Sequence, residues 1–119
     1  MDKNRKIKII SSDNRQFPKL LREIPDAPKK IYVLGELPDS SDDSPLIAIV
    51  GTRKATDYGK RFAKEISQKL TEMGAIIVSG LAMGIDTAAH EGAITANGKT
   101  IAVLANGLDS IYPAQNENL

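Results

Sequence analysis

The chain has 119 residues, enough for one domain with a modest hydrophobic core, and 41% of them are hydrophobic, as in ordinary soluble proteins. It contains no cysteine, which excludes disulfides and thiolate chemistry, and no apolar run approaches the ~20 residues that span a bilayer. The polar, charged N-terminus does not resemble a signal peptide. The net charge of +1 does not by itself indicate a nucleic-acid partner, so any site for a polyanion must be a local patch.

The first part of the chain, residues 1–44, is predicted to be an N-terminal extension that holds a short helix and short strands. Residues 6–10 alternate between basic and apolar side chains and predict a strand, and residues 31–34 predict another. Between them, four large apolar side chains recur at helical spacing: Phe17, Leu20, Leu21 and Ile24. Residues 39–44 read as an acidic, flexible linker, so the main fold is expected to span residues 45–119.

The main fold is predicted from three short apolar runs, residues 46–50, 75–78 and 100–104, each of which leads into a glycine-containing turn. Runs of this kind, alternating with helical patterns, predict a βαβαβ unit with a doubly wound, mainly parallel sheet. The first helix is expected to be capped by Thr56 or Asp57 and to end at Gly74. Its apolar stripe consists of Phe62, Ile66, Leu70 and Met73 and predicts that Ile66 and Met73 are buried. The second helix is expected from about Asp86 to the region of Asn97.

The functional surface is expected at the carboxyl ends of these strands, where ligands bind in open α/β sheets. The glycine spacing there fits neither a Walker loop nor a dinucleotide fingerprint, so ATP hydrolysis and NAD chemistry lose support. Glycine turns before helix N-termini still suit an anion, and an arginine can fork onto a phosphate. The candidate phosphate-binding residues are Gly51, Thr52, Arg53, Tyr58, Ser79, Gly80, Ala82, Gly84 and Asp86.

Several of these residues also have plainer interpretations. Asp86 can simply cap the second helix, or it can form a pair with His90 one turn later, with Ser79 as the nearest nucleophile. Tyr58 can stack on a base or pack against the first loop. A lone histidine without cysteine does not support a zinc site. No catalytic residue, metal or cofactor is therefore assigned.

Together the motifs closely resemble the DprA family of bacterial DNA-processing proteins, also called Smf. The resemblance rests on residues 49–53 (IVGTR), 58–59 (YG), 79–90 (SGLAMGIDTAAH) and 107–113 (GLDSIYP), and upstream on residues 17–21 (FPKLL) and 25–28 (PDAP). It covers nearly the whole chain from about Phe17, and the string from Ser79 to His90 is highly specific. Thr52 stands where the family usually has serine, a change that keeps the hydroxyl.

The resemblance implies a Rossmann-like fold and a cytoplasmic, non-enzymatic protein that binds single-stranded DNA. Such proteins act in natural transformation and help to load a RecA-type recombinase. The chain stops at Leu119, which implies a core that is C-terminally truncated relative to the family, and we expect it to form homo-oligomers because exposed sheet edges invite association. Two alternatives are a sensor domain that binds a small nucleotide and a nucleoside-monophosphate N-glycosidase of a related fold, although the downstream Pro-Gly-Gly loop of those enzymes does not occur.

Overall fold

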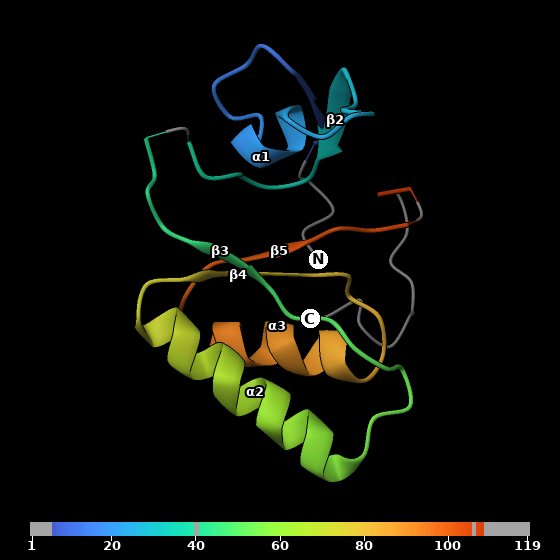
Figure 1. Cartoon of the computed structure of the whole chain (residues 1–119), viewed down its shortest axis with the longest axis vertical. Coiled ribbons are helices and arrows are strands. Elements are labelled where there is room, and N and C mark those ends of the chain that lie inside the picture. Colours follow the sequence, from blue (N-terminus) through green and yellow to red (C-terminus); the bar gives the residue numbers. More distant parts are fainter. Residues whose placement is uncertain (1–5, 40, 106, 109–119) are drawn as a thin grey trace. The chain divides into compact units, whose positions relative to one another are not determined.

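The computed structural model describes residues 6–39, 41–105, 107 and 108. The chain divides into two compact units, one that ends at Asp43 and one that runs from Ser44 onward (Figure 1). The motif at residues 107–113 and the polar tail after it fall almost entirely outside the described residues. Each unit is described by itself.

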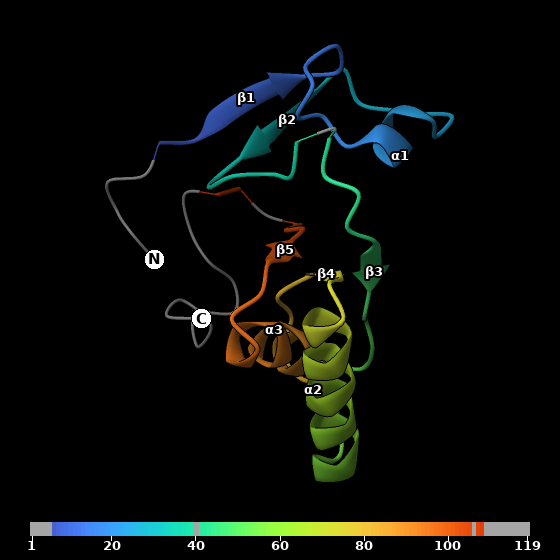
Figure 2. The ribbon, with the colours of Figure 1, turned by 90° about the vertical axis from the view of Figure 1, so that its left-hand side faces the viewer.

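The N-terminal unit is built on a two-stranded antiparallel sheet of β1 (Lys8–Ser11) and β2 (Lys30–Val33), with the short helix α1 (Lys19–Arg22) between them in sequence (Figure 2). Its core consists of the buried side chains of Ile10, Phe17 and Val33. The expected helical stripe is wrong in part, because Leu20 is 70% exposed and Ile24 is 46% exposed. A four-residue helix makes barely one turn, so it cannot carry an apolar face of that length.

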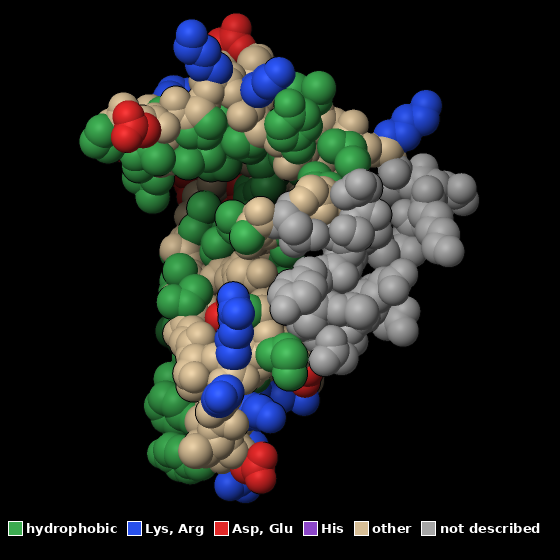
Figure 3. Space-filling model, turned by 90° about the vertical axis from the view of Figure 1, so that its right-hand side faces the viewer, with side chains coloured by type: hydrophobic (Ala, Val, Ile, Leu, Met, Phe, Trp, Pro, Cys, Tyr) green, Lys and Arg blue, Asp and Glu red, His purple; other side chains and the backbone are tan. Residues whose placement is uncertain are grey.

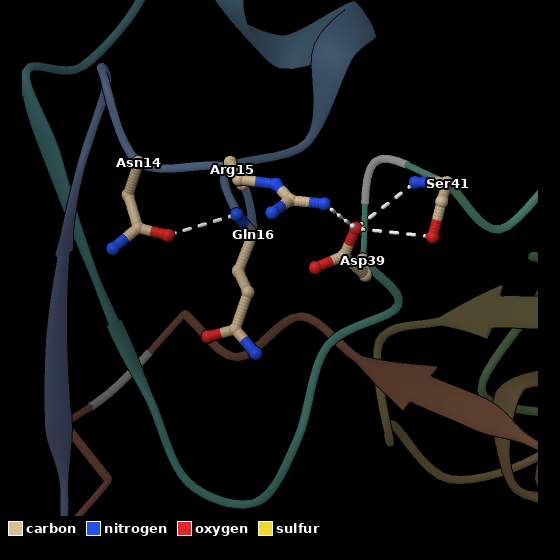
Figure 4. A network of polar contacts seen from close by, with 5 residues as sticks. All are labelled: Asn14, Arg15, Gln16, Asp39 and Ser41. Atoms are coloured by element: carbon tan, nitrogen blue, oxygen red, sulfur yellow. Dashed lines mark hydrogen bonds and ion pairs between the residues drawn. The ribbon is translucent and has the colours of Figure 1, made fainter.

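The beginning of the acidic linker is held by a polar network (Figure 4). The carboxylate of Asp39 accepts hydrogen bonds from the backbone N–H and the hydroxyl of Ser41, at 3.0 and 3.2 Å. The same oxygen lies 3.3 Å from the guanidinium of Arg15. These contacts tie Asp39 to Ser41 and to Arg15 within the N-terminal unit.

The second unit contains a parallel three-stranded sheet in the order β3 (Leu46–Ala48), β4 (Ile76–Ser79), β5 (Thr100–Ala102). The predicted α/β fold class with three parallel neighbouring strands is therefore confirmed. Two helices form the crossovers, α2 (Asp57–Glu72) and α3 (Ile85–Thr95), and both lie on the same face of the sheet (Figures 1 and 2). A doubly wound sheet also has helices on its other face, and the described residues contain the layer on this one only.

Helix α2 turns a different face to the core than its sequence predicts. Its buried residues are Ala63, Ser67 and Thr71, whereas Met73 is 82% exposed and Ile66 is 37% exposed. The prediction that Ile66 and Met73 are buried is therefore wrong. Small side chains face inward because α2 packs closely against the small residues of α3, and a bulky stripe would hold the two helices apart.

The close approach of the two helices centres on Gly92. A Cβ placed there would lie 2.4 Å from the carbonyl oxygen of Lys64 and 2.8 Å from the Cβ of Ser67. The hydroxyl of Ser67 donates to the carbonyl of Ala89 on α3, which joins the helices by a buried hydrogen bond. On the sheet side, Ala89 and Ala93 are fully buried against Ile77 of β4.

Two helix boundaries follow the sequence. Thr56 caps α2 by accepting a hydrogen bond from the N–H of Gly59 at 3.0 Å, as predicted. Gly74 ends the helix with φ of +100°, in the left-handed region that glycine adopts freely. These two residues set the boundaries of α2, and Thr56 therefore also marks the end of the loop that precedes the helix.

Candidate functional site

The two glycine loops at the carboxyl ends of β3 and β4 are in contact. Gly84 has φ of +83°, and a Cβ built on it would lie 2.3 Å from the carbonyl oxygen of Thr52. The next backbone N–H, that of Ile85, donates to the same carbonyl at 3.2 Å. A Cβ on Gly51 would lie 2.7 Å from the side chain of Ile85. Gly84 requires glycine because the backbone of the first loop lies against it, and Gly51 leaves room for the side chain of Ile85.

The first loop carries exposed polar and basic side chains. Thr52, Arg53 and Lys54 are all exposed. The Thr52 hydroxyl accepts a hydrogen bond from the N–H of Lys54 at 3.1 Å, which shapes the turn and leaves the hydroxyl proton available. This loop can present donors and two positive charges to an anion outside the protein.

In the second loop, the backbone donor of Gly80 is already bonded to a side chain of the chain itself. The N–H of Gly80 donates to the carboxylate of Asp86 at 3.2 Å, and a Cβ on Gly80 would lie 2.7 Å from that carboxylate. Asp86 is only 7% exposed. The interpretation of Asp86 as a helix cap is wrong, because the cap position of α3 is Gly84 and makes no side-chain hydrogen bond. The carboxylate instead turns back toward the end of β4.

Ser79 and Ala82 brace this loop from inside. The Ser79 hydroxyl donates to the carbonyl of Ile49 at 2.6 Å and so ties β4 to the chain that continues β3. The carbonyl of Ala82 accepts two hydrogen bonds from Thr87, from its hydroxyl at 2.6 Å and its N–H at 3.1 Å. Leu81 between them has φ of +65°, which costs a non-glycine residue of order 1–3 kcal/mol and is held by this bracing.

His90 is buried behind the loop on α3. Its Nδ1 lies 2.7 Å from the hydroxyl of Thr100, which in turn donates its proton to the carbonyl of Ile77 at 2.8 Å. Because that proton is committed, Nδ1 must be the donor, and Nε2 of the neutral ring is an acceptor. Burial lowers the pKa of His90, and the charge of Asp86 partly opposes this shift. The Ser79 proton goes to Ile49, so no Ser–His nucleophile is assembled in the described part of the chain.

The charge of this region is strongly positive although that of the chain is not. Residues 53–64 contain five lysines and arginines and one aspartate, a local net charge of +4. Lys64 lies 4.0 Å from Glu91, and within the described ranges no ion pair involves Arg53, Lys54, Lys60 or Arg61. Figure 3 shows basic side chains beside hydrophobic ones over the lower half of the molecule, where α2 begins.

Tyr58 lies in the first turn of α2 and is 70% exposed. At this exposure the ring is not buried against the first loop, where packing was one of its two expected roles. Its ring stacks instead on that of Phe62, with the ring centres 6.1 Å apart and the planes 18° from parallel. Phe62 was assigned to the buried stripe of α2 and was missed as a surface residue.

The structure thus brings the candidate residues into one region in two different roles. Thr52, Arg53 and Tyr58 reach solvent, whereas the remaining candidates hold the loops in place: Gly51, Ser79, Gly80, Ala82, Gly84 and Asp86. Over the described ranges, no group of three or more His, Cys, Asp or Glu residues could hold a metal ion. In the same ranges, no helix combines the length and the hydropathy that a membrane crossing requires.

Comparison with known proteins gives consistent matches over most of the chain. The family model for DNA recombination-mediator protein A matches residues 8–119. Protein Smf of Synechocystis is 49% identical over 92% of the chain, and DNA processing protein DprA of Bacillus subtilis is 39% identical over 95% of it. These matches cover 28% and 38% of the two relatives, so the chain spans about a third of their length.

Two solved structures share the fold. DprA of Streptococcus pneumoniae superposes with a TM-score of 0.83 at 40% identity. The match covers 95% of this chain and 39% of the pneumococcal chain. DprA of Helicobacter pylori, for which a unique single-stranded DNA binding mode is described, superposes with a TM-score of 0.77 at 36% identity. That match covers 98% of this chain and 50% of the other.

Proposed function

The chain belongs to the DNA recombination-mediator protein A family, and we propose that it binds the phosphates of single-stranded DNA at the loop formed by residues 51–54. The observation that carries the proposal is the contact between Gly84 and the Thr52 carbonyl, which holds this basic loop rigidly against the start of α3. Because its backbone is already held, the loop loses little backbone freedom on binding, and only the side chains must become ordered.

The proposal gives the two loops different tasks. Phosphate oxygens contact Arg53, Lys54 and the Thr52 hydroxyl at the exposed rim, where a guanidinium can bind bidentately. The interior of the second loop does not take a phosphate, since Asp86 already occupies the Gly80 N–H and its negative charge repels an anion. The second loop therefore positions the first.

Binding to oligo-dT at two salt concentrations tests the proposal, with fluorescence anisotropy as the readout. Phosphate contacts release counterions, so the affinity of the chain should fall steeply as salt rises and should differ little between homopolymers. An affinity that is independent of salt, or no binding even at low salt, would refute phosphate binding by this loop.

We further propose, from the family and not from any contact in this chain, a role of the whole protein in DNA uptake and in loading a RecA-type recombinase in the cytoplasm. Co-sedimentation of a purified recombinase with oligo-dT should increase when the whole protein is added. No increase would refute the recombinase role and leave DNA binding intact.

Self-association is proposed on separate grounds. In the described part of the chain, β3 and β5 each have one strand neighbour only, and Leu46, Val50 and Val103 are 46%, 70% and 64% exposed. Exposed apolar edges favour pairing with another chain. Light scattering should detect a dimer or larger assembly, and a monomer at all concentrations would contradict this.

The chain is proposed to have no enzymatic activity. An N-glycosidase needs a carboxylate that can reach its substrate, and the carboxylate at the centre of this site, Asp86, is buried and bonded to Gly80. Incubation with AMP should release no adenine. A nucleotide sensor is the remaining alternative, and it predicts that AMP competes with oligo-dT at similar concentrations.

A further inference from the structure

We propose that the stacked rings of Tyr58 and Phe62 form a platform on which bases of single-stranded DNA stack, beside the phosphate site. The inference rests on the proposed function, because it assigns the bases of the same strand whose phosphates contact the first loop. It adds a base-binding subsite to a site that otherwise contacts only the backbone of the DNA.

The geometry of the two rings suits this task. Tyr58 is 70% exposed and Phe62 is 52% exposed, and their planes are only 18° from parallel. They lie on consecutive turns of α2, so the helix backbone fixes their spacing. Flat aromatic faces presented to solvent are the feature with which proteins bind unpaired bases, since every base has a stacking face.

The charges around the rings favour a nucleic acid as the occupant. Lys60 and Arg61 lie between the two rings in sequence, and both are exposed. The apolar stripe of α2 continues to Ile66 and Met73, but there the charges are mixed: Glu65, Lys69 and Glu72. Aromatic and basic residues therefore coincide only in the first half of the helix, as required for a surface that takes both a base and its phosphate.

The platform is also fixed relative to the phosphate site. A Cβ on Gly59 would lie 3.3 Å from the Thr56 hydroxyl and 3.7 Å from the Cδ1 of Ile85. The same Ile85 side chain lies against Gly51 in the first loop. The half-buried side chain of Ile85 thus lies beside both the turn that carries Tyr58 and the loop that carries Arg53.

The test compares oligo-dT with an abasic strand of the same length and backbone, bound by the chain and by three variants: Tyr58→Leu, Phe62→Leu and the double substitution. Leucine keeps an apolar side chain and removes the aromatic face. The double variant should lose about 5- to 150-fold in affinity for oligo-dT for each base that stacks. Its affinity for the abasic strand and its salt dependence should stay unchanged, because its phosphate contacts remain.

The matched control is Tyr32→Leu in the N-terminal unit. Tyr32 is 56% exposed, and Lys30 lies 5.8 Å from the centre of its ring, so it is also an exposed aromatic side chain beside a cation. This variant should bind both strands like the parent. Because the chain has no tryptophan, Phe62→Trp provides a single reporter whose fluorescence should be quenched by oligo-dT and not by the abasic strand.

The outcomes separate the platform from the phosphate site. If the parent binds neither strand, both proposals are overturned. If the parent and the double variant bind oligo-dT equally well, only the platform is overturned. Equal losses for oligo-dT and the abasic strand would also overturn it, since the rings would then act through the fold or the charges. If the double substitution dissociates an oligomer and leaves DNA binding unchanged, the rings are a contact between copies of the chain.

Discussion

Replacing Gly84 by alanine should destabilise the second unit far more than the same change at Gly74. Both glycines have positive φ, +83° at Gly84 and +100° at Gly74, so both variants carry backbone strain of about 1–3 kcal/mol. They differ in what the new Cβ meets. No atom lies within 4 Å of it at Gly74, whereas at Gly84 the carbonyl oxygens of Thr52 and Arg53 lie at 2.3 and 2.9 Å.

The additional cost at Gly84 follows from these contacts. Both oxygens belong to backbone, so the first loop must move away, which costs about 1–3 kcal/mol, as for other overpacked sites. The movement also lengthens the hydrogen bond from Ile85 to Thr52, whose net contribution is about 0.5–1.5 kcal/mol. Gly84→Ala should therefore lose about 2–4 kcal/mol more than Gly74→Ala, a large share of the 5–15 kcal/mol that ordinary domains possess.

Urea denaturation followed by circular dichroism measures the free energy of unfolding of the parent and both variants. In thermal melts the same difference corresponds to a gap of roughly 10–30 °C, at about 4–8 °C per kcal/mol for a domain of this size. If the two variants unfold within about 0.5 kcal/mol of each other, a margin typical of harmless surface changes, the two loops do not pack as described.

Three further predictions concern the helices and the histidine. Gly92→Ala should destabilise by about 1–3 kcal/mol in urea denaturation, although alanine normally stabilises a helix interior by about 0.5–1 kcal/mol, because the added Cβ meets Ser67 and the backbone of α2. A stabilised variant would contradict the close helix contact. Met73→Ala should change the free energy of unfolding by less than about 0.5 kcal/mol, because Met73 is exposed. The side chain of Leu70 packs against the core, so Leu70→Ala should cost about 2 kcal/mol or more. Equal losses would mean that Met73 is buried, as the sequence predicts. Because the folded-state pKa of His90 lies below its unfolded value near 6.5, the unfolded chain binds the proton more tightly, and stability should fall as the pH drops below about 6.5. His90 is the one histidine of the chain, so His90→Gln should remove this pH dependence. If the pH dependence persists in the variant, another titrating group causes it.

The arrangement of the sheet could be predicted because each local signal agreed with the others. The β-branched runs, the Thr56 cap and Gly74 each mark an element boundary through backbone chemistry that does not depend on the rest of the fold. The buried face of α2 could not be predicted in the same way. A search for large apolar residues finds Phe62 and Met73, but which face turns inward depends on the small residues of the neighbouring helix.

The sequence predicts that the two glycine loops meet, but it does not predict the side-chain contacts within them. Loops at the carboxyl ends of parallel strands must meet at one edge, so Gly51 and Gly84 could be placed together from topology. Nothing in the sequence shows that the carboxylate of Asp86 turns back to Gly80, or that Leu81 adopts positive φ, because both depend on contacts made only in the folded chain. The stacked, exposed pair of Tyr58 and Phe62 could not be predicted from the assumption that every residue of an apolar stripe is buried.

The central claim is that the first loop binds DNA phosphate through Arg53, and the salt dependence of oligo-dT binding by Arg53→Ala tests it most directly. Lys69→Ala is the control, because Lys69 is an exposed cation in the last turn of α2, at the other end of that helix from the first loop. Loss of one phosphate contact should make the slope of log affinity against log salt shallower by about 0.7 and reduce affinity by about 1.5–3 kcal/mol, with stability changed by less than about 0.5 kcal/mol. Lys69→Ala should bind like the parent. An Arg53→Ala variant with the parent's affinity and salt slope would contradict the account, because Arg53 would then be an ordinary solvated side chain.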